Sequence, residues 1–285
     1  MKNANLLSIH LAILLVGFSA LFARLIPQNA MTITFGRVFF ASLVLGLFLL
    51  LKKQTIKIHD KKDLYFLMLT GIVLAMHWSS FIFSIQIASV AIGTLAFSTF
   101  PLFVAFLEPL FFKEPFEVKN ILYACLTLVG IGIIAFHAFT EGTPYFLGVF
   151  FGLFAGFSYA VTTLLNRRFV SRYETPVILF YQQGCAALVL FPVVLLLRPT
   201  FQVVDVGALL IYGVIFTALS QTLFVRGLRT VSGATAGIIT SLEPVYAILF
   251  SIIFIAEFPR WHEIVGGIII ITVAAYVTRK KANSV

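Results

Sequence analysis

The chain has 285 residues, of which 60% are hydrophobic and only 11% are charged, and its mean hydropathy is +1.05. These values lie outside the range of soluble globular domains and exclude a soluble globular protein. The formal net charge is +9. It does not indicate nucleic-acid binding, because the basic residues are scattered over many short loops and no basic and aromatic groove accompanies them.

Ten apolar stretches follow one another along the chain, each near the roughly 20 residues that a helix needs to cross about 30 Å of hydrocarbon. They predict an all-α integral membrane protein with ten transmembrane helices. We place these spans at residues 6–24, 30–51, 64–86, 90–112, 118–138, 145–165, 177–197, 205–226, 234–256 and 261–278. The first span resembles a signal peptide, but it is longer than a typical signal h-region.

The basic residues predict the orientation of these spans. With a cytoplasmic N-terminus, 16 of the 20 Lys and Arg residues lie on the inner side: Lys2, Lys52, Lys53, Lys57, Lys61, Lys62, Lys113, Lys119, Arg167, Arg168, Arg172, Arg226, Arg229, Arg279, Lys280 and Lys281. The outer side holds only Arg24, Arg198 and Arg260, and Arg37 lies within a span. The positive-inside rule therefore predicts a multi-pass plasma (inner) membrane protein with both termini in the cytoplasm, the last seven residues, 279–285, forming a basic tail.

The chain also repeats itself. A shift of 143 residues aligns residues 89–115 with 232–258 without a gap and matches Pro101 with Pro244. Shorter matches lie earlier in each half: GFSA (17–20) with GFSY (156–159) at a shift of 139, and ASLVL (41–45) with AALVL (186–190) at a shift of 145. We expect two five-helix repeats, 6–138 and 145–278. Because five is odd, the second repeat must cross the membrane in the opposite sense, as in secondary transporters with inverted repeats.

At these residues the chain resembles the EamA repeats of the drug/metabolite transporter superfamily. The shared pattern is an A-x9-P signature before a Glu that ends the fourth span, here Ala91, Pro101 and Glu114, then Ala234, Pro244 and Glu257. An Arg early in the second span, here Arg37, also fits. In this family the second Glu often follows a Gly, whereas here Ala256 precedes the second Glu, and Lys113 precedes the first. The resemblance implies a ten-helix exporter of amino acids or other small metabolites.

Glu243 is the strongest candidate for a site residue, because a charged side chain at the bilayer centre costs roughly 2.5 to 3.5 kcal/mol and is retained mainly for function. It lies near the middle of span 234–256. The shift of 143 pairs it with Phe100, so this carboxylate belongs to the second repeat alone. The alternatives are a structural ion pair or a protonated carboxyl. Glu108 lies near Lys113 at a span end, where snorkelling or capping explains it better.

Further polar and aromatic residues lie near mid-span and supply the hydrogen bonds and ring walls of a small-molecule pocket. They are His77, Trp78, Phe81, Gln221, Arg37, Tyr159, Gln182 and Gln183. Each also has a structural reading as an interhelical contact. Arg37 has two functional readings, a substrate carboxylate ligand or half of an outer gate pair.

Two features concern the backbone. Pro101 and Pro244 each free a carbonyl about one turn earlier and predict a bend, which either lines a cavity or only shapes the packing. Gly148, Gly152 and Gly156 recur every four residues and predict a close-packing helix face, within the bundle or in a homodimer.

Enzyme motifs are absent: the chain has no P-loop, no G-x-S-x-G, no Cys pair at metal spacing, and no second His four residues after His262. We therefore predict no enzyme activity, no cofactor and no metal. The expected partners are a small-molecule substrate, the lipid bilayer, and protons or ions as coupling species, with Glu243 or His77 as the titrating group. The competing function classes are an intramembrane enzyme and a passive small-solute channel.

Overall fold

The computed structural model describes residues 2–112, 118–141, 143–167, 169–170, 172–227, 239–240 and 242–282. Within these ranges the regular elements are helices and no strand occurs. Lys113, Glu114 and Ala234 lie outside the described residues, as do the side chains of the predicted basic tail.

The helices follow the predicted spans, with two of the spans divided. The elements of the first half are α1 (Lys2–Leu25), α2 (Ala30–Leu51), α3 (Lys61–Ile87), α4 (Val90–Phe97), α5 (Phe100–Phe112) and α6 (Lys119–Glu141). Those of the second half are α7 (Thr143–Arg167), α8 (Thr175–Leu197), α9 (Val203–Gly213), the π-helix η1 (Val214–Leu219), α10 (Ser220–Gly227), α12 (Glu243–Ile255) and α13 (Trp261–Ala282). Polar caps fix several starts: the Asn29 side chain accepts from the Thr32 amide, and the Ser89 side chain from the Ile92 amide.

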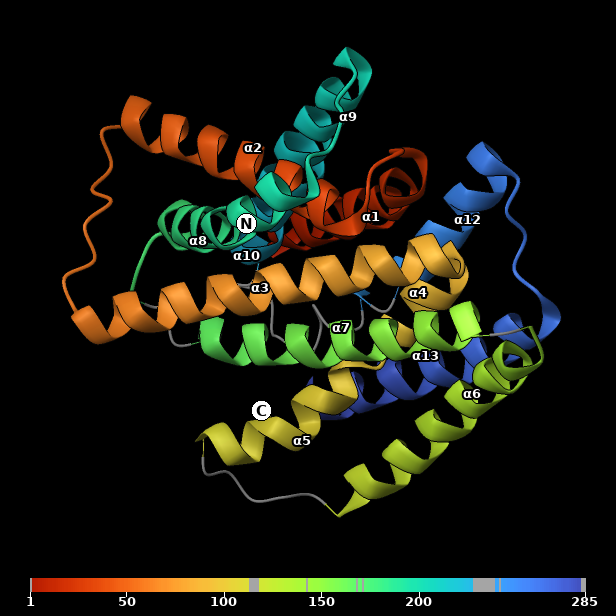
Figure 1. The fold of residues 1–285 in the computed structure, drawn as a ribbon. Coiled ribbons are helices and arrows are strands. Elements are labelled where there is room, and N and C mark those ends of the chain that lie inside the picture. The colour runs from red at the N-terminus through yellow and green to blue at the C-terminus, as the bar shows by residue number, and fades with distance from the viewer. Residues whose placement is uncertain are drawn as a thin grey trace.

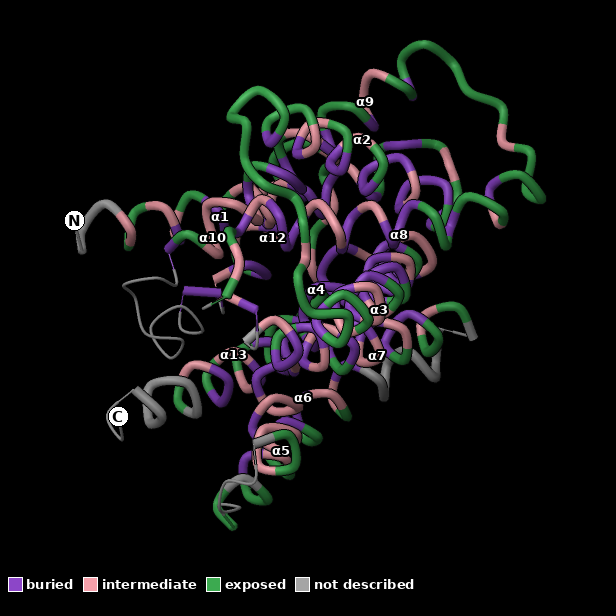
Figure 2. Tube along the Cα trace, turned by 90° about the vertical axis from the view of Figure 1, so that its left-hand side faces the viewer, coloured by how far each residue is buried: buried purple, intermediate pink, exposed green. Residues whose placement is uncertain are grey.

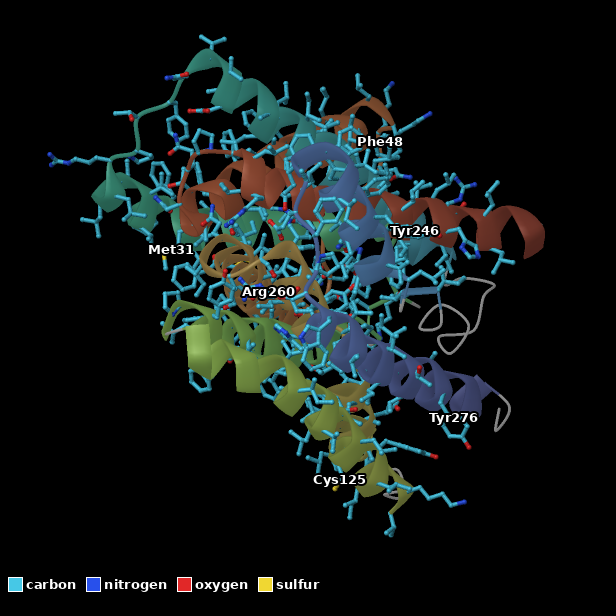
Figure 3. The ribbon with its side chains drawn as sticks, turned by 90° about the vertical axis from the view of Figure 1, so that its right-hand side faces the viewer. Met31, Phe48, Cys125, Tyr246, Arg260 and Tyr276 are labelled. Carbon is cyan, nitrogen blue, oxygen red and sulfur yellow. The ribbon has the colours of Figure 1, made fainter. Side chains whose placement is uncertain are left out.

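Among the described residues, seven helical segments are long and apolar enough to cross a membrane, counting α4 with α5 and α9 with α10 as one each. The described residues also form three shorter apolar helices, at 121–134, 243–255 and 261–276. Apolar side chains cover the outside of the bundle, where Phe48, Cys125 and Tyr276 project at its periphery (Figure 3). A membrane fold follows, whereas the number of ten spans and the orientation stay predictions.

Helices α3 and α7 lie side by side through the middle of the molecule, with α1, α2, α8 and α9 on one side and α5, α6 and α13 on the other (Figure 1). They run antiparallel, because the Ser84 hydroxyl donates to the Gly148 carbonyl and His77 pairs with Ala155 further along. Burial is concentrated in this central layer (Figure 2).

The glycine face of α7 makes this central packing close. A Cβ added at Gly148 would lie 2.4 Å from the Cβ of Ala88, and one at Gly152 would lie 2.6 Å from the Cβ of Ala96. Real Cβ atoms do not approach so closely, so larger residues at these positions would push α7 away from α3 and α4. This glycine face is therefore used within the chain; a homodimer stays a prediction.

Both repeat-matched prolines lie in the first turn of a helix. Pro101 is the second residue of α5 and Pro244 the second residue of α12. Proline fits the first turn, where its missing N–H would have no intrahelical partner. Before α5 the chain breaks at Ser98 and Thr99, whose hydroxyls donate to carbonyls of α4, each at 2.8 Å. The span 90–112 is thus two half-helices instead of one bent helix.

Candidate functional site

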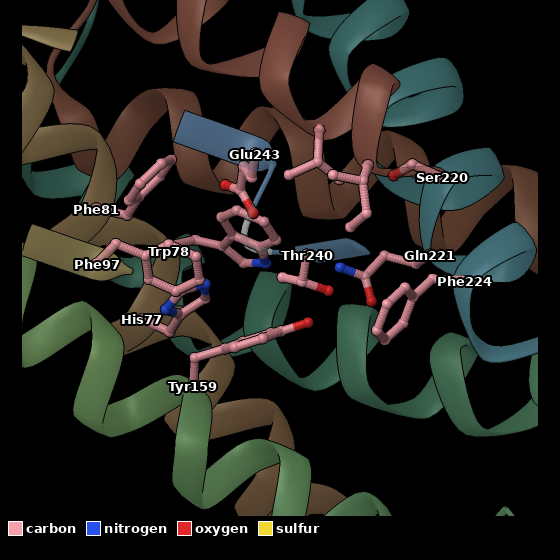
Figure 4. Close-up of a pocket in the computed structure, with 12 residues that line it drawn as sticks. His77, Trp78, Phe81, Phe97, Tyr159, Ser220, Gln221, Phe224, Thr240 and Glu243 are labelled. Atoms are coloured by element: carbon pink, nitrogen blue, oxygen red, sulfur yellow. The ribbon is translucent and has the colours of Figure 1, made fainter. Parts of the chain in front are cut away.

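A narrow pocket lies at the centre of the bundle (Figure 4). Its walls come from α1, α3, α4, α7, α10, α12 and Thr240. The lining residues are Ile13, Val16, His77, Trp78, Phe81, Phe97, Tyr159, Ser220, Gln221, Phe224, Thr240 and Glu243. Six of the residues singled out in the sequence are thus brought together: Glu243, His77, Trp78, Phe81, Gln221 and Tyr159.

Eight of these twelve residues form four pairs under the 143-residue shift of the sequence repeat. The pairs are His77 with Ser220, Trp78 with Gln221, Phe81 with Phe224, and Phe97 with Thr240. Each pair contributes one residue from either half of the chain to the same pocket. The chemistry of the pairs differs, because the first half supplies mostly rings and the second half mostly hydroxyl and amide groups.

Glu243 is the first residue of α12, and its carboxylate points into the pocket (Figure 4). Its side chain is buried, with a relative exposure of 4%, and within the described ranges it makes no hydrogen bond and no ion pair. Burial disfavours a charge on this carboxylate, and two positive fields oppose that effect in part: the N-terminal end of α12 and the guanidinium of Arg37, which acts electrostatically without direct contact. Helix α1 packs against this turn, since a Cβ on Gly17 would lie 3.2 Å from the Glu243 carbonyl oxygen.

Arg37 lies behind the pocket wall. Its guanidinium carbon is 3.5 Å from the ring centroid of Trp78 and 4.2 Å from that of Tyr212, and the side chain is fully buried. The Nε donates to the Thr217 hydroxyl and one Nη donates to the Tyr212 hydroxyl, both at 3.0 Å. The second Nη has no partner among the described residues. The indole ring of Trp78 therefore separates Arg37 from the pocket.

The π-helix explains how two residues of one span reach the same guanidinium. Tyr212 is the next-to-last residue of α9 and Thr217 lies within η1. The Thr217 hydroxyl also donates to the Tyr212 carbonyl five residues earlier, at 3.0 Å. A π turn places residues five apart on one side, which an α turn does not. The matching span of the first half, α3, shows no such turn.

His77 presents an acceptor to the pocket. Its Nδ1–H donates to the Ala155 carbonyl at 2.9 Å, and its Nε2 is buried without a partner in the described part of the chain. A second N–H there would have no acceptor, so we assign the neutral ring with its lone pair on Nε2. The ring lies 4.9 Å from that of Tyr159 and 4.6 Å from that of Trp78, centroid to centroid.

Three predicted site residues lie elsewhere. Arg37 is screened by Trp78, as described above, and Gln182 and Gln183 lie on α8 outside the pocket lining. The Gln182 amide donates to the Asn166 side chain, an interhelical contact between α8 and α7. Gln183 is buried, and its Oε1 has no partner in the residues that the structure describes.

Ile13 and Val16 on α1 were missed by the sequence reasoning, because apolar residues in an apolar span carry no signal of their own. Four other lining residues could be found from the sequence. Under the 143-residue shift, Ser220 and Phe224 are the partners of His77 and Phe81. Phe97 and Thr240 lie one turn before Pro101 and Pro244, where each proline frees a carbonyl. No group of three or more His, Cys, Asp or Glu residues that would hold a metal occurs in the searched, described residues.

A polar network closes one end of the bundle. We call it the Glu257 end; it consists of Arg24, Gln86, Val90, Glu257 and Glu263. The Val90 amide donates to one Glu257 oxygen at 2.6 Å, and Arg24 lies 3.6 Å from the other. Arg24 also donates to the Gln86 carbonyl at 2.7 Å. The end of α1, the junction of α3 and α4, and the α12–α13 loop are thus tied together.

The opposite end of α3 has a smaller link. Asp63 is buried and accepts from Arg172 at 3.0 Å and from the Tyr173 hydroxyl at 3.0 Å. This joins the start of α3 to the segment between α7 and α8.

Comparison with known proteins identifies relatives over nearly the full chain. The model of the EamA-like transporter family matches residues 4–136 and again 146–279. An "uncharacterized transporter" of Archaeoglobus fulgidus is 28% identical over 93% of this chain and 92% of its own length. Proteins named S-adenosylmethionine uptake transporter are 26% identical in Rickettsia conorii, over 89% of this chain and 85% of theirs, and 24% identical in Rickettsia felis, over 90% and 86%. A protein crystal structure, 16% identical, matches with a TM-score of 0.70 over 100% of both chains and supports the fold.

Proposed function

The chain belongs to the EamA-like transporter family, and we propose that it is a secondary transporter that carries a small organic metabolite across the plasma membrane by alternating access. The observation that carries this proposal is the central pocket lined by four repeat-related pairs. A site on the axis between two inverted repeats is exposed to either side when one repeat rocks against the other. In this proposal the repeats are 6–138 and 145–278, both termini are cytoplasmic, and 279–285 is a basic cytoplasmic tail.

Glu243 is the proposed site for the substrate or for a coupling proton. A buried carboxylate without a hydrogen bond is costly, and it becomes favourable when a ligand or a proton occupies it. The chain carries no ATP-binding motif, so the proposed energy source is a gradient of substrate, proton or another ion.

The direction of transport in the cell is set by those gradients, because an alternating-access cycle runs either way. The Rickettsia relatives are named for S-adenosylmethionine uptake, which makes this compound one candidate substrate. The family resemblance suggests export of amino acids or other metabolites as the other candidate. Both are small solutes with hydrogen-bonding groups and suit a pocket of rings, amide and hydroxyl groups.

Counterflow in proteoliposomes tests the proposal. Vesicles holding purified protein are loaded with S-adenosylmethionine or a mixture of amino acids, and entry of the same labelled compound is followed without any ion gradient. A carrier exchanges labelled for unlabelled solute and shows transient accumulation. A passive channel only equilibrates, and an intramembrane enzyme converts the solute; either outcome contradicts the proposal.

The Glu257 end is the proposed outer closure, and Glu257→Gln should loosen it. The Val90 amide at the start of α4 donates to the Glu257 carboxylate, a charge-assisted bond that the neutral amide weakens. We expect hydrogen exchange in the peptide around Val90 to accelerate about tenfold, since the local opening energy falls by roughly 1.4 kcal/mol. The measurement is hydrogen-exchange mass spectrometry of the purified protein.

Glu174→Gln is the matched control, because Glu174 also precedes a helix but its side chain makes no cap hydrogen bond. Its exchange pattern around Val90 should equal that of the wild type. Equal exchange around Val90 in Glu257→Gln and wild type would contradict a closing role for Glu257.

A further inference from the structure

We propose that the central pocket selects organic monocations, with Glu243 as the group that sets this preference. The inference rests on the proposed function, because it assigns the substrate class of the same pocket. It follows from the charge, the exposed ring surface and the free acceptors on the pocket wall.

The carboxylate is the first step. Glu243 carries the one formal charge among the twelve described lining residues, and its oxygens face the pocket without a hydrogen-bond partner (Figure 4). A neutral ligand leaves this charge unpaired, and an anionic ligand adds a second negative charge beside it. A cationic ligand compensates this charge. Among ligands of equal shape, the charge of the ligand therefore makes the largest difference in binding free energy.

The start of α12 points the same way. Half-helices that begin near a binding site bind anions at their free N-terminal ends. Here the first residue of that half-helix is Glu243, so its carboxylate already occupies the positive end of α12. The carboxylate of Glu243 thereby prevents an anionic group of a ligand from binding at the N-terminal end of α12.

Rings form the wall beside the carboxylate. Between ring centroids, Tyr159 lies 4.9 Å from His77 and 5.5 Å from Phe97, and Phe97 lies 5.3 Å from Phe81. Aromatic faces attract cations, and cages of several rings hold quaternary ammonium groups. A cation already contacts the side of this wall that faces away from the pocket: the guanidinium carbon of Arg37 lies 3.5 Å from the ring centroid of Trp78.

Arg37 does not reverse the preference. Its guanidinium contacts the wall, yet Trp78 lies between it and the pocket, and Arg37 is absent from the described lining. Its field acts on Glu243 from behind this wall, without direct contact. The ligand meets the carboxylate, and the His77 lone pair adds a second acceptor on the same wall.

The chain offers a built-in reporter for the test. It has two tryptophans, of which Trp78 lines the pocket and Trp261 is 68% exposed. In a Trp261→Phe background, emission reports on Trp78 alone. The probes are choline, its uncharged carbon isostere dimethylbutanol, and the anion dimethylbutanoate, which share one shape and differ in charge.

We expect choline to bind at least about tenfold more tightly than dimethylbutanol, and dimethylbutanoate to bind most weakly. In Glu243→Gln the ratio of choline to dimethylbutanol affinity should fall below about threefold, while dimethylbutanol binds as in the parent, which also shows that the variant keeps its pocket. Glu243→Asp should retain the preference. Glu108→Gln, at another Glu-Pro position and outside the pocket lining, should leave it unchanged.

Equal or tighter binding of dimethylbutanol, tighter binding of dimethylbutanoate, or no saturable response to choline would overturn the inference. So would an unchanged charge preference in Glu243→Gln. These outcomes differ from failure of the proposed function: choline binding without counterflow of any solute contradicts transport alone, and counterflow without charge preference contradicts the cation inference alone.

Discussion

Glu243→Gln should lower the counterflow rate about 10- to 100-fold while the protein stays folded. The substitution keeps the shape of the side chain and removes its charge, which costs the ligand or proton one charge-assisted contact, worth about 1.5 to 3 kcal/mol. Because Glu243 makes no hydrogen bond or ion pair in the described part of the chain, the fold loses no contact. The measurement is initial counterflow rate in proteoliposomes, with and without a pH gradient.

Glu108→Gln serves as the control and should keep wild-type rates, because Glu108 lies on α5 away from the pocket lining. If a pH gradient drives wild-type transport, it should not drive transport by Glu243→Gln. A Glu243→Gln rate equal to that of the wild type under both conditions would remove Glu243 from the mechanism.

Arg37→Met should destabilise the protein by about 3 to 5 kcal/mol, because it leaves two buried oxygens without their donor, each at a cost of about 1 to 3 kcal/mol. These are the Tyr212 and Thr217 hydroxyl oxygens. Trp78 also loses the guanidinium on its rear face. The measurements are the thermal midpoint of the purified protein and the emission of Trp78 in the Trp261→Phe background.

Arg37→Lys separates charge from geometry. Lysine keeps the positive charge, but it lacks the planar stack and the forked donors, so we expect a loss between those of wild type and Arg37→Met. Lys57→Met, in the exposed loop between α2 and α3, should change stability by less than about 0.5 kcal/mol. Equal stability of Arg37→Met and wild type would show that the hydrogen bonds and ring contacts of Arg37 do not stabilise the fold.

Much of the fold was predictable because membrane insertion and repetition leave strong patterns in a sequence. Apolar spans near 20 residues and a gapless 143-residue register need no knowledge of side-chain packing. The same register carries most of the pocket. His77, Trp78 and Phe81 were chosen for their chemistry, and the shift then points to Ser220, Gln221 and Phe224.

Other parts of the site depend on packing that a sequence does not display. Arg37 reads as a ligand in the sequence, yet it stacks behind Trp78, because the π turn of η1 brings Tyr212 and Thr217 to it. Gln182 and Gln183 have the same polarity as Gln221 but face other helices. Composition along one span does not show which face of a helix meets the pocket.

Glu243 illustrates both sides. Its isolation within an apolar run and its lack of a repeat partner were visible in the sequence. That it begins a half-helix, with its own carboxylate at the positive end, required the structure. This placement changes the interpretation from a charge inside a continuous span to a charge at a helix start, which is less costly and directs the carboxylate into the pocket.

Substrate protection tests the central claim that the transported solute occupies the Glu243 pocket. In a Cys185→Ser background, Gln221→Cys places a thiol on the pocket wall, and the exposed Cys125 serves as an internal control. A saturating concentration of the solute that gives counterflow should slow thiol modification at position 221 about tenfold, as mass action requires for an occupied site, and leave Cys125 unchanged. Equal modification at position 221 with and without that solute would contradict the claim.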